Sequence, residues 1–341
     1  MIKQSALFLS LCLASVATTT TLAFTSPTCT GIASSSRCQR HSNTPLKAAG
    51  GEAPQYDKIY AVLKGTQVLG KGSVLLQIET TNPDTKLDYQ PGHVIALEVE
   101  DTSEDMNDDT KKNGGWMRGP YTISRATEQS MDILIKVVGK KSKVLAEGNI
   151  NDSNNKHNNN HLTVRFGGKF KVPILEGVAK DDVKQVVLLS TGVGVGPCVG
   201  AIEKALSKEE EMPFPPIALI PSFREEEEVV YREHLDKLAQ ENPSKFQWQP
   251  IVTSKTGRLS SSPETMKMVT DKIEGLSLQD THYHLIGNGQ MVNEWKGGLE
   301  KAGVPAERVT VELYFNSVAE KDEARIETIA NAIASACSVA A

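Results

Sequence analysis

The sequence predicts two consecutive structural classes, an antiparallel β domain followed by an α/β domain with a parallel sheet. In the first half of the 341-residue chain, short β-rich runs are separated by Gly, Pro and Asn clusters, with no long helical period between them. In the second half, continuous apolar runs alternate with helical patterns, which is typical of parallel strands joined by right-handed crossovers. The length also favours two domains, at about 150 residues each.

The β domain is placed at residues 50–178. Its expected strands are short and rich in β-branched residues, and they lie at 59–63, 74–80, 94–99, 120–124, 132–138 and 162–166. Polar inserts at 101–115 and 149–161 are expected to be solvated loops. Strands of this length in this order favour a barrel or a sandwich.

The α/β domain is placed at residues 179–316. Its expected strands lie at 186–189, 217–220, 246–252, 283–286 and 309–313, and its expected helices at 199–206, 226–240 and 291–302. The remaining tail, 317–341, carries Ile326, Ile329 and Ile333 at helical spacing, which predicts a helix. Most such tails dock on their own domain, and the alternative is binding to a partner or a membrane surface.

Charge and cysteine content exclude some classes of function. The net charge is −5, of which +4 comes from the first 51 residues, so the body of the protein carries −9. This acidic body gives no reason to expect a nucleic-acid partner. Of five cysteines, only Cys198 and Cys337 lie in the body. They predict neither a disulfide framework nor a metal site, and we interpret Cys198 as a small buried helix residue.

The first 49 residues are typical of a removable leader. Lys3 precedes an apolar run, Ala6–Ala17, which is too short to span a bilayer and fits a signal peptide with Ala23 at the cleavage site. The following segment is rich in Ser and Thr, basic and free of acids, as transit peptides are. This two-part leader resembles those of algae with secondary plastids and predicts plastid import. Secretion is the alternative, and no transmembrane segment is expected after removal of the leader.

Two glycine-rich turns predict nucleotide binding. Ser190–Pro197 follows a buried strand and opens a helix, and Leu285–Met291 repeats the order of strand, Gly turn and helix. Glycines let a backbone approach a pyrophosphate closely, and a helix N-terminus offers free N–H groups and positive potential.

Two further motifs lie in the β domain. In Arg118–Ser124, a guanidinium can hold a pyrophosphate, the Tyr121 ring can stack on a flat cofactor, and the Thr122 hydroxyl can bond a ring nitrogen. Gly139–Ser142 is a Gly turn after the strand at 132–138.

The order of these motifs resembles that of the ferredoxin–NADP reductase superfamily, over roughly Ile59–Phe315. The resemblance implies an antiparallel FAD-binding β-barrel followed by a Rossmann-like NAD(P)-binding domain. It also implies a flavoprotein oxidoreductase that uses FAD and NAD(P)H.

The resemblance assigns roles to matching residues in the β domain. Arg118 would hold the FAD pyrophosphate, Tyr121 would stack on the flavin, and Thr122 would bond flavin N5 as a catalytic residue. Gly139 and Ser142 would clamp the pyrophosphate. Arg118 departs from the family pattern because it lies one residue further from Tyr121 than the family Arg does.

In the α/β domain the resemblance assigns NAD(P)H binding to the two Gly turns. The matching positions are Thr191, Gly192, Gly194, Gly196 and Pro197 in the first turn and Gly287, Asn288, Gly289 and Met291 in the second, at the nicotinamide. Glu312 fits the acidic and aromatic C-terminal segment and is the second expected catalytic residue. Ile286 stands where the photosynthetic enzymes have Cys.

The strand at 217–220 ends in a segment expected at the adenosine ribose. Ser222 and Arg224 are predicted to bind a 2′-phosphate, with Tyr231 and Arg258 as further candidates. The run Glu225–Glu228 would repel such a phosphate if it pointed inward, but an acidic first helical turn, favoured by the helix dipole, explains the run better. We therefore expect NADP rather than NAD.

The implied activity is hydride transfer between NADPH and FAD, with electrons passed to an unidentified acceptor. One alternative is a photosynthetic ferredoxin–NADP reductase in the strict sense, which the acidic body disfavours because ferredoxins are themselves acidic. Another is a non-enzymatic tethering protein on the same fold, for which the shifted Arg118 is the main argument.

Overall fold

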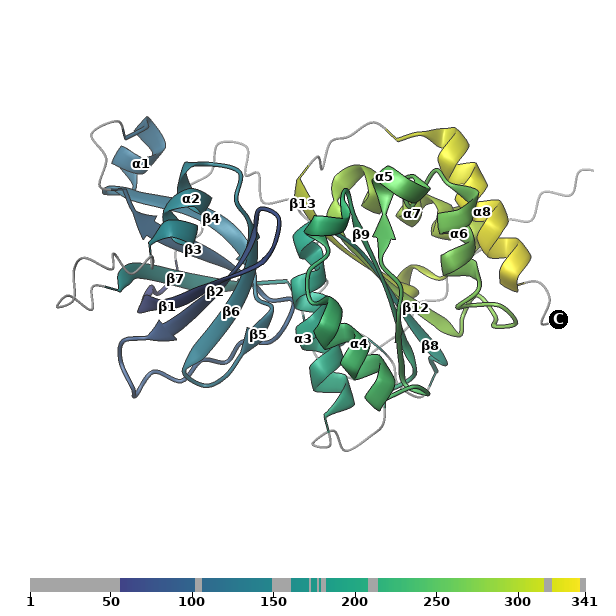
Figure 1. Cartoon of the computed structure of the whole chain (residues 1–341), viewed down its shortest axis with the longest axis horizontal. Helices are drawn as coiled ribbons and strands as arrows, with labels where there is room; N and C mark the ends of the chain where they lie inside the picture. Colours follow the sequence, from purple (N-terminus) through teal and green to yellow (C-terminus); the bar gives the residue numbers. More distant parts are fainter. Residues whose placement is uncertain are drawn as a thin grey trace, which may run out of the picture. The chain divides into compact units, whose positions relative to one another are not determined.

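The computed structural model describes residues 56–101, 106–148, 161–171, 173–176, 178, 182–207, 214–315 and 321–337 (Figure 1). The predicted leader and nearly all of the Asn-rich insert fall outside the described residues, so the predictions for them are untested. Gln55–Ala341 forms one compact unit.

A seven-stranded antiparallel sheet opens this unit. Its strands are β1 (Ile59–Gly70), β2 (Ser73–Thr80), β3 (Val94–Glu100), β4 (Trp116–Thr122), β5 (Arg125–Ala126), β6 (Ser130–Lys136) and β7 (Leu162–Phe170), in the order β4-β3-β7-β1-β2-β6-β5. Just beyond β4, the Ser124 N–H donates to the carbonyl of Asp132 on β6 at 2.8 Å. The sheet therefore curls until β4 meets β6, which gives the predicted barrel.

Alternation of side chains along the strands fills the barrel. Residues two apart point to the same face of a strand, and the buried side chains follow that period in Ala61 and Leu63, Leu76 and Ile78, Ile95 and Leu97, and Val164 and Phe166. Two short helices lie between strands, α1 (Asp108–Lys112) and α2 (Lys140–Glu147). The sequence suggested only a turn at α2, but Leu145 is fully buried in the barrel core and anchors a helix there.

A parallel sheet follows, as predicted. Its strands are β8 (Gln185–Thr191), β9 (Ile217–Phe223), β10 (Phe246–Trp248), β11 (Ile251–Val252), β12 (Thr281–Asn288) and β13 (Val309–Phe315). The order is β10-β9-β8-β12-β13, and β11 also pairs with β9. The helices are α3 (Val195–Leu206), α4 (Arg232–Glu241), α5 (Thr253–Thr256), α6 (Pro263–Thr270), α7 (Gly289–Ala302) and α8 (Glu323–Cys337), with 3-10 turns η1 (Gly192–Gly194), η2 (Glu226–Glu228) and η3 (Ala306–Arg308).

The two faces of this sheet have separate cores. On β8, Val186 and Leu188 join a core beneath α3 and α4, and Val187 and Leu189 join one beneath α6, α7 and α8 (Figure 1). A strand buried on both faces explains the unbroken apolar run that the sequence shows there. Cys198 is fully buried in α3, as interpreted.

The expected helix at 226–240 is divided in the structure. A short 3-10 turn is followed by Val229 and Val230, both buried in the core, and α4 begins only at Arg232. Tyr231 takes a left-handed conformation with φ 59° at the break. Burial of the two β-branched side chains therefore overrides the helical pattern of the charged residues around them.

The C-terminal tail forms α8, with Ile326, Ile329 and Ile333 buried. It packs closely on α7, because a Cβ atom at Gly298 would overlap the Ile329 side chain. Within the described part of the chain, none of the helices has both the length and the apolar character needed to cross a bilayer.

Candidate functional site

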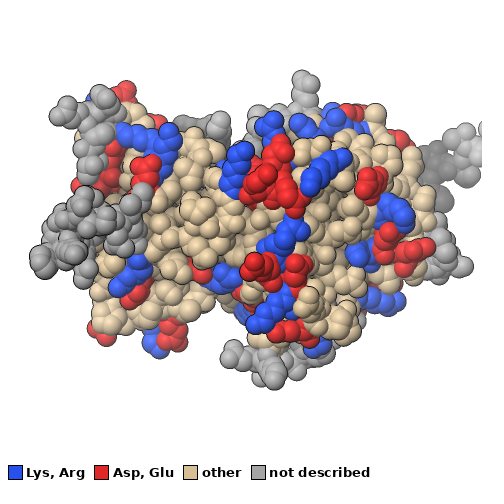
Figure 2. Space-filling model, in the orientation of Figure 1, with Lys and Arg blue, Asp and Glu red and all other residues tan. Residues whose placement is uncertain are grey.

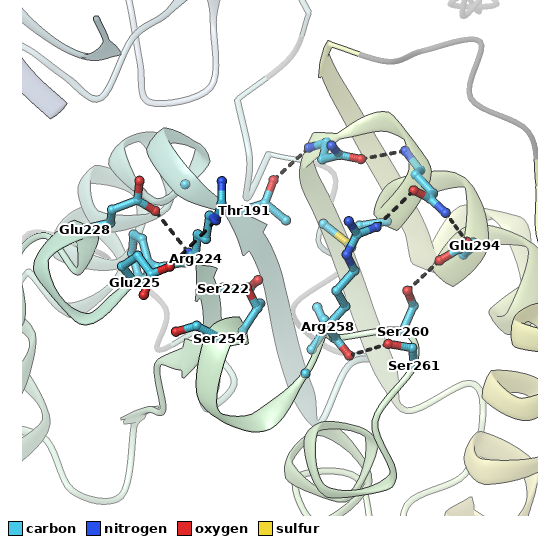
Figure 3. Close-up of a pocket in the computed structure, with 18 of the residues that line it drawn as sticks. Thr191, Ser222, Arg224, Glu225, Glu228, Ser254, Arg258, Ser260, Ser261 and Glu294 are labelled. Atoms are coloured by element: carbon cyan, nitrogen blue, oxygen red, sulfur yellow. Dashed lines mark hydrogen bonds and ion pairs between the residues drawn. The ribbon is translucent and has the colours of Figure 1, made fainter. Parts of the chain in front are cut away.

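A cavity of about 1030 Å³ lies at the carboxyl-terminal ends of β8, β9 and β12 (Figure 3). Parallel α/β sheets bind their ligands at this edge. The cavity is lined by the further candidate Arg258 and by six of the residues predicted to bind the nicotinamide nucleotide, namely Thr191, Gly192, Ser222, Arg224, Asn288 and Met291. Lys136, from β6 of the barrel, also lines it. The two predicted nucleotide turns thus meet in one cavity that the barrel borders.

The first turn leaves room for a ligand at one glycine. β8 ends at Thr191, and Gly192 begins η1 with φ +53°. Apart from its own neighbours in the chain, none of the described residues has a heavy atom within 4 Å of the position that a Cβ atom on Gly192 would take. A ligand can therefore approach the backbone at Gly192 closely.

The later residues of this turn have a different environment. Gly194, Gly196 and Pro197 are buried, and a Cβ atom at Gly196 would clash with the Ser124 hydroxyl and with Leu134 of the barrel. The absence of a side chain at Gly196 thus lets the start of α3 lie against the barrel. Nucleotide binding by these three residues stays a prediction, with packing as a sufficient reason for Gly196.

The second turn is coupled to the first by a hydrogen bond. Gly287 has φ +123°, and a Cβ atom there would overlap the Thr191 hydroxyl. The absence of that atom lets Thr191 Oγ1 accept the Asn288 N–H at 2.7 Å. Asn288 also caps α7, in whose first turn Gly289 and Met291 lie. The two turns are therefore held in a fixed relation at the cavity.

One side of the cavity carries mixed charge after β9. Ser222 is buried, whereas the Arg224 side chain is 82% exposed and its Nε lies 3.7 Å from a carboxylate oxygen of Glu225. Glu228 accepts from the Lys136 ammonium at 2.9 Å. Arg224 thus has the freedom to turn toward a phosphate, and Glu228 has Lys136 as a separate cationic partner.

The opposite side carries a buried network that the sequence did not reveal. Glu294, on α7, is 1% exposed and accepts hydrogen bonds from Ser260 at 2.5 Å and Gln290 at 3.0 Å. Its counter-ion is Arg325 of α8, at 3.2 Å. Gln290 in turn accepts from Arg258 at 3.4 Å (Figure 3). The C-terminal helix therefore forms part of the cavity wall, through contacts between residues far apart in sequence.

The predicted flavin-binding residues lie on β4 and at the start of α2. Tyr121 is half-buried at the edge of the barrel core, and burial raises the pKa of its hydroxyl to about 12. The Ser142 hydroxyl accepts the N–H groups of Val138 and Gly139, both at 3.0 Å, and closes the first turn of α2. Beyond the chain neighbours of Gly139, no heavy atom in the described part of the chain lies within 4 Å of a Cβ position there. This helix N-terminus is thus open to an anion such as a pyrophosphate, which fits the expected FAD.

Arg118 lies apart from these residues. It stacks on the Tyr56 ring, 4.8 Å from the ring centroid, and its Nε lies 3.9 Å from Glu98. Glu98 is 1% exposed and is also paired with Lys58 and Arg165. The Arg118 guanidinium therefore belongs to a cluster of cations around a buried carboxylate. Its contact with a pyrophosphate stays a prediction.

The two predicted catalytic residues are in direct contact. The Thr122 hydroxyl, at the end of β4, donates a hydrogen bond to the Glu312 carboxylate on β13. Burial raises the pKa of Glu312 to about 7, against the opposing effects of the Thr122 hydrogen bond and the Lys171 charge. The sequence placed these residues 190 positions apart without showing that they touch.

This contact lies close to the nucleotide cavity. Glu312 pairs with Ile286 on β12, which in turn pairs with Ser190 on β8, directly before Thr191. Neighbouring strands are about 4.8 Å apart, so the Glu312 backbone lies roughly 10 Å from the first nucleotide turn. A flavin at Thr122 and a nicotinamide in the cavity would therefore be neighbours.

Comparisons with known proteins support this arrangement at the level of fold. Residues 188–296 match the family model of the oxidoreductase NAD-binding domain. No match was found among curated proteins. The cytochrome b5 reductase domain of Ulva prolifera nitrate reductase superposes with a TM-score of 0.54 at 16% identity, over 76% of this chain and 97% of that chain.

Two further solved structures are similar. Ferredoxin-NADP+ reductase from Plasmodium falciparum gives a TM-score of 0.55 at 14% identity, over 75% of this chain and 96% of that one. Flavohemoglobin from Malassezia yamatoensis, solved with bound FAD and heme, gives 0.57 at 17% identity over 76% of this chain. The match spans only 60% of the flavohemoglobin chain.

Proposed function

Because the chain has the two-domain fold of ferredoxin–NADP reductase-like flavoprotein reductases, we propose that it is an FAD-dependent NADPH oxidoreductase. The observation that carries the proposal is the Thr122–Glu312 contact. It places the end of β4, the barrel strand that holds Tyr121, against the parallel sheet. The nucleotide cavity lies at the carboxyl-terminal edge of that sheet. A protein that only tethers a partner has no need for this convergence.

FAD bound at Tyr121 would supply hydride acceptance from a reduced nicotinamide and onward electron transfer. The chain's own residues bind and orient the reactants. Thr122 offers its hydroxyl at the point where β4 ends. Glu312, with a pKa raised to about 7, holds or releases a proton at its carboxylate near neutral pH. Because Gly192 has no side chain, a nucleotide in the cavity can closely approach the protein backbone at that residue.

We further propose that NADPH is preferred over NADH. Arg224 and Arg258 both line the cavity. Among the described residues, Arg258 has no carboxylate partner, and its hydrogen bond to Gln290 is long. A guanidinium with free donors suits a 2′-phosphate. Glu228 is already paired with Lys136, which limits its repulsion of a phosphate.

The electron acceptor is left open. Figure 2 shows acidic and basic side chains interspersed over the visible face, with no extended basic area among the described residues there. That face offers no obvious docking surface for an acidic ferredoxin. It therefore gives no support for the strict photosynthetic reductase.

The test is the colour and reactivity of the purified protein. We expect a yellow protein that releases FAD on denaturation and whose flavin absorbance is bleached by NADPH under anaerobic conditions, faster than by NADH. Arg224→Ala and Arg258→Ala should each narrow the NADPH preference, by about tenfold for one charged hydrogen bond to phosphate. A colourless protein that takes up no FAD would refute the enzyme, and equal rates with both nucleotides would refute the preference alone.

A further inference from the structure

Arg118 and Tyr121, the residue expected to stack on the flavin, lie on opposite faces of one strand. Side chains alternate between the two faces of a strand. Arg118 and Tyr121 are three residues apart within β4 (Trp116–Thr122), so they project from opposite faces. Gly119 lies on the Tyr121 face, with the Tyr121 ring 4.0 Å from the place of its missing Cβ atom.

Lys141 fills the space that Gly119 leaves. A Cβ atom at Gly119 would overlap the Lys141 ammonium, so any side chain at that position would displace the end of this lysine from its place. The ammonium lies over the face of the Tyr121 ring, 4.3 Å from its centroid. Lys141 belongs to the first turn of α2, two residues after Gly139. A cation is thus placed between the aromatic ring and the open helix N-terminus.

The part of the chain that the structure describes gives this cation no counter-ion. Among the described residues, no carboxylate forms an ion pair with Lys141, and Glu98, whose charge acts on it, is already paired with Arg165. Burial lowers the pKa of Lys141 to about 8. A ring face compensates only part of the lost hydration of an ammonium. An anion that reached this place would be bound in water-poor surroundings, where charged hydrogen bonds are strong.

We propose that Lys141, and not Arg118, binds the phosphate groups of the flavin nucleotide. This inference rests on the proposed function, because it requires a flavin at Tyr121. The flavin takes the ring face, and the ammonium leaves it for the phosphates beside Gly139. Arg118 stays with Glu98 and supports the barrel.

The experiment compares FAD with riboflavin, which has the flavin ring but no phosphate. Dissociation constants are measured by flavin fluorescence on flavin-free protein for the unmutated chain, Lys141→Met, Lys143→Met and Arg118→Met. Methionine keeps the length and helix propensity of lysine while removing its charge. Lys143 is the matched control, an exposed lysine on the same helix. Far-UV circular dichroism and the thermal midpoint verify that each variant is folded.

We expect Lys141→Met to weaken FAD binding roughly tenfold to hundredfold, the value of a charged hydrogen bond. Its affinity for riboflavin should match that of the unmutated protein. Lys143→Met and Arg118→Met should change the FAD to riboflavin ratio less than twofold.

Three results would overturn the inference. They are an equal loss of FAD and riboflavin affinity in Lys141→Met, an unchanged or tighter affinity for FAD in that variant, and a selective loss of FAD affinity in Arg118→Met. Failure of the proposed function looks different, because the unmutated protein would then bind neither FAD nor riboflavin.

Discussion

Replacing Glu312 with glutamine should change how the stability of the flavin-free protein depends on pH. Glu312 is 6% exposed, and its pKa is raised from 4.5 to about 7, chiefly by burial. Between those values the folded protein holds a proton that the unfolded chain has released. Stability therefore falls as pH rises through this window and is constant above it. Glutamine has the same shape, cannot ionise, and can keep a hydrogen bond with Thr122.

The magnitude follows from the pKa difference. Each unit of pKa difference between the folded and unfolded states corresponds to about 1.36 kcal/mol of stability. The difference between 4.5 and about 7 therefore corresponds to about 3 kcal/mol. The free energy of unfolding of Glu312→Gln, relative to the unmutated protein, should therefore rise by that amount between pH 4.5 and pH 8. Urea unfolding followed by tryptophan fluorescence at half-unit pH steps measures this difference.

Glu327→Gln is the control. This exposed carboxylate is paired with Lys301, which lowers its pKa below 4.5. The relative stability of that variant should therefore change with pH only near and below pH 4.5, in the opposite direction, and should be nearly constant from pH 5 to pH 8. The reasoning on Glu312 would be refuted if its variant showed a constant difference across the range, or one that declined as pH rose.

Three further predictions concern the reaction, the cavity wall and the leader. Thr122→Val keeps the side-chain shape but removes the hydroxyl, so FAD should stay bound while its reduction by NADPH in stopped-flow experiments slows several-fold; an unchanged rate would contradict the role of Thr122. Arg325→Met leaves the buried Glu294 carboxylate without its counter-ion and should lower the free energy of unfolding by about 3 kcal/mol, whereas Lys296→Met, in an exposed pair, should cost below about 0.5 kcal/mol; equal losses would count against the buried network. Residues 1–51 fused to a fluorescent reporter should direct it to the plastid, and a secreted or cytosolic reporter would contradict the leader prediction.

The sequence by itself determined the two-domain fold, because the evidence for it is local. The short β-rich runs of the barrel and the apolar runs of β8 and β9 can be read over a few residues. The same holds for the Gly turns, since a strand followed at once by glycines and a helix places a ligand site by chain order alone. The separation of Arg118 from Tyr121 was not predicted in this way, because the expected strand began at residue 120 and only the structure extends β4 back to Trp116.

Only the tertiary structure decided which of these local features meet. Gly192 and Gly196 look alike in sequence, but one borders open space and the other lies against Ser124 of the barrel. The Lys141 ammonium can lie over the Tyr121 ring because Gly119, on another element, has no side chain. The burial of a charged group and its counter-ion both depend on residues that are distant in the chain. No local sequence pattern therefore predicts how they change the charge of that group or its binding of a ligand.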